Sequence, residues 1–198
     1  MKTFGDATIL SGGKSSRMGF DKSLLKINDQ YVLQDMYDKL TTVFDRVFLS
    51  VNPNTNPDKF NIFNIELVQD IHTDILGPVA AVHTALTHAN SQYIFVIACD
   101  MPIINTEHIK HMMYIAEKES PQGIIPINGK YKEVLYAFYH KSAIQAFHES
   151  IQEGDYKMQI ILDKLDIYYL EQSESQKIDK KLHMFTNLNY EADLKKLI

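Results

Sequence analysis

A run of glycine, serine and basic residues follows the first apolar segment of the chain. It reads LSGGKSSRMGFDK from Leu10 to Lys22 and begins within the short apolar run 7–11. Its glycines permit the backbone to approach a ligand closely, and its cations, which include Lys14 and Arg17, match the charge of phosphate groups. Backbone N–H groups combined with cations are what binding of a polyphosphate requires. The segment therefore predicts a phosphate-binding loop, with a plain strand-to-helix turn as the alternative.

This loop matches neither of the two common nucleotide-binding motifs. A Walker A motif requires a glycine five residues before its final glycine, and Thr8 stands five residues before Gly13. The Rossmann spacing GxGxxG is also absent from the segment. The prediction of phosphate binding therefore depends on the glycines and cations themselves.

An aspartate follows the most apolar segment of the chain. The run Tyr93–Ala98 predicts a fully buried strand, and it leads through Cys99 to Asp100. A carboxylate at the end of such a strand is costly unless it meets a cation. Mg²⁺ binds through one or two carboxylates together with substrate phosphates, so Asp100 is the candidate magnesium ligand. The alternative is an N-cap of the next helix, a role that Asn105 or Thr106 can also take.

Four further polar residues stand near predicted strand ends or turns. Asp70 ends a short strand and is placed to contact a ribose or base, although a surface aspartate is equally common there. Asn187 and Asn189 are two amides that share one face if they lie on a strand, or else belong to a polar turn. Lys157 adds a cation near a turn and is otherwise an ordinary surface lysine.

The elements that position these residues alternate between strands and helices. We predict strands at 7–11, 46–51, 65–68, 93–98, 123–127, 134–139 and 165–170, helices at 32–43, 77–89, 106–118 and 190–198, two helices within 142–165, and a polar loop at 171–181. This alternation predicts an α/β fold with a mostly parallel central sheet covered on both faces. In such sheets ligands bind at the carboxyl ends of the strands.

Size and composition limit the classes of protein that the chain can belong to. Its 198 residues, 45% hydrophobic and 23% charged, predict a single globular domain over 1–198. The net charge of −5 predicts no general attraction to nucleic acid or to an anionic membrane. The single cysteine, Cys99, excludes an internal disulfide and a cysteine-based zinc site. No apolar run approaches the roughly 20 residues that span a bilayer, and Asp6 precedes any long apolar stretch, so we expect a cytoplasmic protein without a signal peptide.

Several segments together resemble the molybdenum cofactor guanylyltransferases. The signature loop of that family is similar to LSGGKSSRMGFDKSLL in this chain, where Ser11 stands in place of the usual alanine. Residues 77–81, GPVAA, resemble the family's GPLAG, and residues 99–102 match its CDMP segment. Residues 187–194, NLNYEADL, resemble its NINTPEDL without the TP. The segments occur in the family's order along the whole chain.

The resemblance implies a Rossmann-like, three-layer nucleotidyltransferase fold with a mostly parallel central sheet. It implies transfer of GMP from GTP to the phosphate of molybdopterin carrying molybdenum, with release of pyrophosphate. Mg²⁺ is the implied cofactor, and other proteins of molybdenum cofactor biosynthesis are implied partners, with neither nucleic acid nor membrane involved. Because the acceptor phosphate is itself the nucleophile, catalysis in such a transfer consists of positioning and charge neutralisation.

The matching motifs assign roles to individual residues. The implied catalytic residues are Lys22, Asp100 and Arg17. The residues implied to bind GTP are Leu10, Ser11, Gly12, Gly13, Lys22, Asn52, Asp70 and Asp100. The residues implied to lie near the metal or the acceptor are Asn187, Asn189 and Lys157. Asp100 is also the implied metal ligand, and Lys157 stands where the family often has arginine, so it keeps the charge but loses the planar fork of donors.

Two other functions stay open at this point. A cytidylyltransferase or a sugar-phosphate nucleotidyltransferase of the same superfamily shares the fold and the metal-binding aspartate, and differs in base and acceptor. A nucleotide-binding regulator without catalysis is a different class, against which the joint presence of Asp100, Lys22 and Arg17 argues. The pair Gly12-Gly13 favours GTP, since related cytidylyltransferases tend to have alanine and then glycine there.

Overall fold

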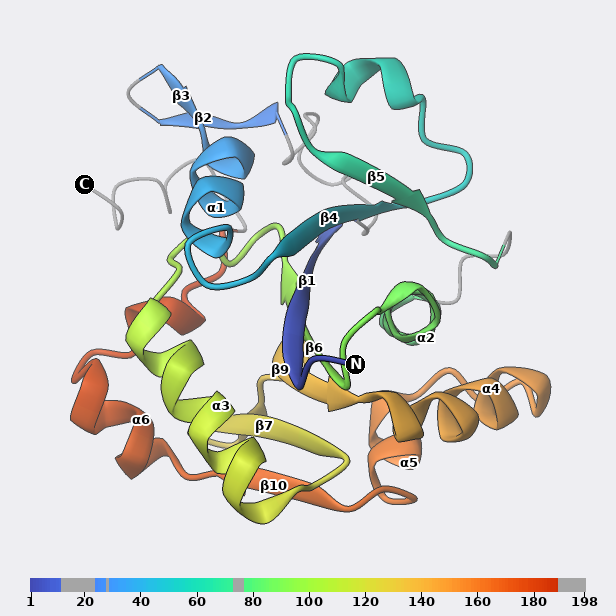
Figure 1. The fold of residues 1–198 in the computed structure, drawn as a ribbon, viewed down its shortest axis with the longest axis vertical. Coiled ribbons are helices and arrows are strands. Elements are labelled where there is room, and N and C mark those ends of the chain that lie inside the picture. Colours follow the sequence, from blue (N-terminus) through green and yellow to red (C-terminus); the bar gives the residue numbers. More distant parts are fainter. Residues whose placement is uncertain (12–23, 28, 73–76, 189–198) are drawn as a thin grey trace.

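A mixed sheet runs through the centre of the computed structural model, which describes residues 1–11, 24–27, 29–72 and 77–188 (Figure 1). Within these residues its strands lie side by side in the order β10 (Ile167–Leu170), β7 (Gly123–Asn128), β9 (Tyr136–His140), β6 (Tyr93–Ala98), β1 (Phe4–Ser11), β4 (Arg46–Val51) and β5 (Glu66–Gln69). A further short strand, β8 (Tyr131–Lys132), pairs with β7 alone. A separate hairpin joins β2 (Lys26–Ile27) to β3 (Gln30–Tyr31).

Strand direction decides which chain segments meet at one edge of the sheet. The pairs β1–β4, β4–β5, β1–β6 and β7–β10 are parallel, whereas β9 runs antiparallel to both β6 and β7. The predicted mostly parallel sheet is therefore confirmed. The carboxyl ends of β1, β4, β5 and β6 lie along one edge, and the end of β7 and the start of β9 lie along the same edge.

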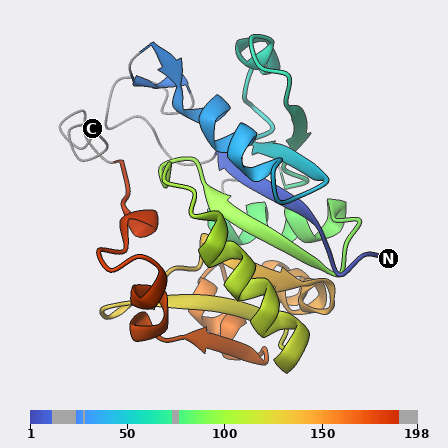
Figure 2. The ribbon, with the colours of Figure 1, turned by 60° about the vertical axis from the view of Figure 1, so that its left-hand side comes forward.

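Helices cover both faces of this sheet and complete three layers (Figure 1). On one face lie α1 (Val32–Leu40), α3 (Thr106–Glu119) and α6 (Gln172–Ile178), and on the other α2 (Pro78–His88), α4 (Ile144–Gln152) and α5 (Met158–Leu162). Short 3₁₀ helices are η3 (Pro57–Phe60), η4 (Lys141–Ala143) and η5 (His183–Phe185). Figure 2 shows α3 crossing its face of the sheet, with the C-terminal part of the described chain beside it. None of the described helices has the length and apolar character needed to cross a bilayer.

The strand β6 is buried along its whole length, as its uninterrupted apolar sequence predicts. Its side chains alternate between the two faces. Phe95 and Ile97 belong to the core beneath α1 and α3, whereas Ile94 and Val96 belong to the core beneath α2 and α4. Because both faces are covered, no position within β6 can hold a hydrated charge.

One predicted element is wrong: residues 171–181 do not form a loop throughout, since they contain α6. The helix has a single fully buried residue, Ser175, so it lacks the apolar period by which a helix is recognised in a sequence. The Ser175 hydroxyl lies 2.9 Å from Nε2 of His108 on α3, and this contact joins the two helices. The expected terminal helix at 190–198 lies outside the described residues.

Two histidines of this fold are buried and kept neutral. The Nδ1 atom of His83 on α2 lies 3.0 Å from Nε2 of His72. The ring of His108 on α3 forms a hydrogen bond with the hydroxyl of Ser175. Burial, with a smaller contribution from neighbouring histidines, lowers the pKa of each ring from 6.5 to about 4, and Asp179 opposes this shift at His108. Between these two pKa values the unfolded chain binds protons that the native protein does not.

We therefore predict that the free energy of unfolding falls as the pH decreases from about 6.5 towards 4. Urea unfolding at a series of pH values measures the slope of this free energy against pH. His108→Gln should make this slope smaller, because it removes one of the two buried rings. A slope that is the same in the parent and in His108→Gln would contradict the account.

Candidate functional site

The carboxyl ends of four adjacent strands bring the predicted polar residues to one edge of the sheet. Leu10 and Ser11 end β1, Asn52 follows β4, Asp70 follows β5, and Asp100 follows β6 by two residues. Main-chain hydrogen bonds join the neighbouring connections: the N–H of Cys99 donates to the carbonyl of Leu10 at 3.1 Å, and that of Asp70 donates to Val51 at 2.9 Å. The structure therefore brings these five candidate residues together.

Asp70 is held in a fixed orientation at the end of β5. The hydroxyl of Ser50, a buried residue of β4, donates to Oδ1 of Asp70 at 2.6 Å. Burial raises the pKa of the Asp70 carboxyl, while the Ser50 bond and the nearby His72 act in the opposite direction. A half-buried carboxylate that keeps one oxygen for a ligand suits recognition of hydroxyl or amino groups.

Asn52 belongs to a turn that closes directly after β4. Its side-chain oxygen accepts a hydrogen bond from the N–H of Asn54 at 2.9 Å, and its carbonyl accepts one from Thr55 at 2.8 Å. Since the oxygen is used within the turn, a ligand at this edge would meet the Nδ2 donor of Asn52. The turn therefore leaves the Nδ2 donor of Asn52 outside its own hydrogen bonds, and the main-chain bond from Asp70 to Val51 brings the two connections together.

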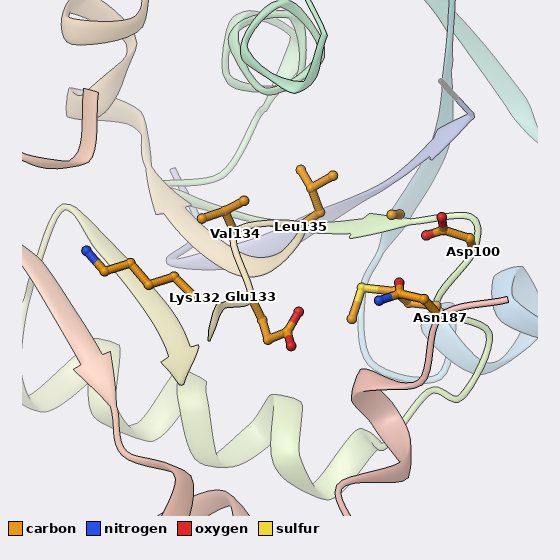
Figure 3. Close-up of a pocket in the computed structure, with 8 residues that line it drawn as sticks. Asp100, Lys132, Glu133, Val134, Leu135 and Asn187 are labelled. Atoms are coloured by element: carbon orange, nitrogen blue, oxygen red, sulfur yellow. The ribbon is translucent and has the colours of Figure 1, made fainter. Parts of the chain in front are cut away.

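Asp100 lies in the turn that follows β6, half-buried at the middle of the edge. The N-cap of α3 is instead Asn105, whose side-chain oxygen accepts a hydrogen bond from the N–H of His108 at 3.0 Å. The N-cap alternative for Asp100 is therefore wrong. The N–H of Leu188 donates to the carbonyl of Asp100 at 2.7 Å, which places Asn187 beside this turn (Figure 3).

Asp100 and Asn187 line a pocket with a volume of about 310 Å³ (Figure 3). This volume is at the lower end of the range for small-molecule sites. Its lining residues are Ala98, Asp100, Met101, Lys132, Glu133, Val134, Leu135 and Asn187. The pocket therefore extends from the end of β6 to the segment that joins β8 to β9.

Lys132 and Glu133 are pocket residues that the sequence analysis missed. They follow a two-residue turn at Gly129-Lys130, where Gly129 has a φ of 62° and the chain returns from β7 into β8 with Asn128 paired to Tyr131. Glycine at the first central position is typical of a two-residue hairpin turn, so Gly129 in the sequence could have revealed the reversal. It would not have shown that the hairpin reaches Asp100.

One described candidate, Lys157, is not brought to this pocket. Lys157 is exposed at the start of α5, where its N–H lies 3.3 Å from Oδ1 of Asp155, and it is not among the residues that line the pocket. Five candidates lie outside the described residues: Gly12, Gly13, Arg17, Lys22 and Asn189.

Asp100 and Asn187 offer an oxygen set that fits a magnesium ion bound jointly with a substrate. Within the described part of the chain, no group of three or more His, Cys, Asp or Glu side chains is arranged to hold a metal alone. Mg²⁺ is commonly held by only one or two carboxylates, with phosphate and water oxygens completing its shell. One carboxylate beside one amide at an open pocket is consistent with that mode of binding.

Comparison with known proteins gives closely agreeing results. The model of the MobA-like NTP transferase domain family matches residues 7–168. A probable molybdenum cofactor guanylyltransferase of Peptoclostridium acidaminophilum is 32% identical over 98% of this chain and 88% of its own length. A molybdenum cofactor guanylyltransferase of Syntrophotalea carbinolica is also 32% identical, over 98% of this chain and 90% of its own length. The crystal structure of molybdopterin-guanine dinucleotide biosynthesis protein A from Archaeoglobus fulgidus superposes with a TM-score of 0.85 at 27% identity, covering 96% of this chain and 95% of that one.

The contact between Ser50 and Asp70 gives a direct test of the site's geometry. Ser50→Ala should lower the free energy of unfolding by about 1–2 kcal/mol at pH 7, since a hydrogen bond to a charged group is lost. A double-mutant cycle with Asp70→Ala, measured by urea unfolding, isolates the interaction between the two side chains. The interaction energy should shrink at a pH low enough to protonate Asp70. A value of zero at pH 7 would show that the bond does not form.

Proposed function

This chain belongs to the family of MobA-like NTP transferase domains, and on that premise we propose that it is a molybdenum cofactor guanylyltransferase. The reaction transfers GMP from GTP to the phosphate of molybdopterin carrying molybdenum and releases pyrophosphate. Its substrates are accordingly GTP and this acceptor, and proteins that make or deliver the acceptor are the expected partners.

The observation that carries the proposal is the position of Asp100 between two groups of polar residues. On one side of β6 lie the ends of β1, β4 and β5, with Asp70 and Asn52. On the other side the pocket extends towards β9 and contains Glu133. A transfer between two substrates requires two binding regions that meet at the reacting phosphate, and Asp100 stands where these regions meet.

The chemistry requires no nucleophile from the protein. An oxygen of the acceptor phosphate attacks the α-phosphorus of GTP, and the bond from that phosphorus to the oxygen bridging it to the β-phosphate breaks. The electron pair leaves with pyrophosphate. Both reactants are anions, so the residues around the site must align them and offset their charge.

Asp100 is the proposed magnesium ligand, with Asn187 beside it. Bound there, Mg²⁺ would neutralise negative charge on the triphosphate and on the departing pyrophosphate. The cations Lys22 and Arg17 and the backbone of Gly12 and Gly13 are proposed to hold the phosphates. These four residues lie outside the described structure, and their roles depend on the sequence motif.

Asp70 and Asn52 are proposed to hold the nucleoside, with Ser11 and Gly12 beside the base. An acceptor at Asp70 and a donor at Asn52 offer both kinds of hydrogen bond to ribose hydroxyls or base edges. Guanine presents N1–H, an exocyclic amine and O6, and a site matched to these groups leaves polar atoms unpaired when another base enters.

Asp100→Asn should reduce the rate of pyrophosphate release from GTP and molybdenum-loaded molybdopterin by about a hundredfold or more, because the ligand charge is lost. The variant should unfold at the same temperature as the parent. Asp163→Asn, an exposed aspartate after α5, is the matched control and should keep full activity. Parental activity of Asp100→Asn at limiting Mg²⁺ would contradict the metal role. A parent protein that binds GTP without any turnover would instead be a regulator.

Nucleotide preference tests the assignment of the base. Calorimetric titration with GTP, ATP and CTP in the presence of Mg²⁺ should show GTP binding at least tenfold more tightly than the other two. The reason is the donor and acceptor pattern of guanine, which neither adenine nor cytosine reproduces. Equal affinities, or tighter binding of CTP, would reject guanylyl transfer and favour a cytidylyltransferase of the same superfamily.

A further inference from the structure

The pocket contains a second carboxylate, Glu133, for which nucleotide binding and metal binding provide no role. It lies on the segment between β8 and β9, and Figure 3 shows its carboxylate extending from that segment on the side of Asn187. Asp100 lies further along, at the end of β6. The two carboxylates therefore occupy different positions in one pocket.

Within the described part of the chain, Glu133 is held in place by an amide and pairs with no cation. Among the described residues, only Asn128 donates to its carboxylate, from Nδ2 to Oε1 at 2.9 Å. The neighbouring Lys132 directs its ammonium elsewhere, to Gln159 Oε1 and to the Tyr169 hydroxyl, each at 3.0 Å. Burial raises the pKa of Glu133 while the Asn128 bond lowers it, so this half-buried group gains from further hydrogen-bond donors.

The position of this carboxylate determines which substrate it can meet. The nucleotide is placed over the ends of β1, β4 and β5, on the other side of β6 from Glu133. The acceptor must bring its phosphate to Asp100, and the rest of the acceptor then extends along the pocket. There it meets the partly exposed apolar side chains of Val134 and Leu135, which suit a flat ring.

We propose that Glu133 recognises the pterin ring of the acceptor by accepting hydrogen bonds from its N3–H and its 2-amino group. These two donors lie side by side on one edge of the ring, and a carboxylate presents two oxygens with matching spacing. That edge and the phosphate stand at opposite ends of molybdopterin, and Glu133 and Asp100 enter the pocket from different segments, one before β9 and the other after β6. This inference rests on the proposed function.

Two fluorescent fragments that differ in one group test the contact: 6-hydroxymethylpterin, which carries the 2-amino group, and 6-hydroxymethyllumazine, which carries an oxo group there. Fluorescence titration of the parent protein should show the pterin binding at least tenfold more tightly, since the lumazine oxygen faces a carboxylate. Glu133→Gln should weaken pterin binding about tenfold and abolish the preference. Glu149→Gln, at an exposed position of α4, is the matched control and should retain both. A preference that persists in Glu133→Gln overturns the inference.

The transfer reaction separates this inference from the proposed function. In Glu133→Gln the KM for molybdenum-loaded molybdopterin should rise about tenfold or more, while the KM for GTP and the Mg²⁺ concentration for half-maximal rate stay at parental values. A change confined to the Mg²⁺ requirement would make Glu133 a metal ligand and overturn the inference. A parent that discriminates pterin from lumazine but transfers no GMP would contradict the proposed function alone. A parent that transfers GMP, with acceptor KM unaffected by Glu133→Gln, would contradict this inference alone.

Discussion

The burial of β6 on both faces is the constraint on which the site depends. Six consecutive apolar residues fill the middle of the protein, and the chain can carry a hydrated charge again only after Ala98. The first acidic residue beyond that point is Asp100. Because β1 and β4 run parallel to β6, their ends reach the same edge, and the polar residues after them lie along the same edge as the aspartate.

The edge is divided by β9, which runs antiparallel to its neighbours β6 and β7. β9 starts, rather than ends, beside Asp100, so the chain that enters it supplies pocket residues from a hairpin instead of a strand terminus. The hydrogen bond from the N–H of Leu188 to the carbonyl of Asp100 holds the segment after η5 against the same pocket. This contact brings Asn187 into the pocket lining. Parallel strands thus supply the nucleotide half of the proposed site, and the hairpin and the C-terminal segment supply the acceptor half.

Local sequence predicted the elements that are defined by continuous apolar runs and failed where tertiary contacts decide. The bounds of β4 and β6 agree with prediction at both ends, because a turn signal follows Val51 and polar residues follow Ala98. The helix α6 was missed, since its one fully buried residue is a serine that pairs with a distant histidine. Glu133 was missed for a related reason: the antiparallel direction of β9, which no local pattern encodes, places it in the pocket with Asp100.

The central claim is that nucleotide and acceptor meet at Asp100 from opposite sides of β6. A crystal structure with Mg²⁺ and a GTP analogue that carries a methylene group between the α- and β-phosphates tests this most directly, because the analogue cannot release pyrophosphate. The account predicts the guanosine over the ends of β1, β4 and β5 near Asp70, the α-phosphate beside Asp100, and the pocket at Glu133 left open. A guanine base seated in the pocket between Asp100 and Glu133 would contradict it.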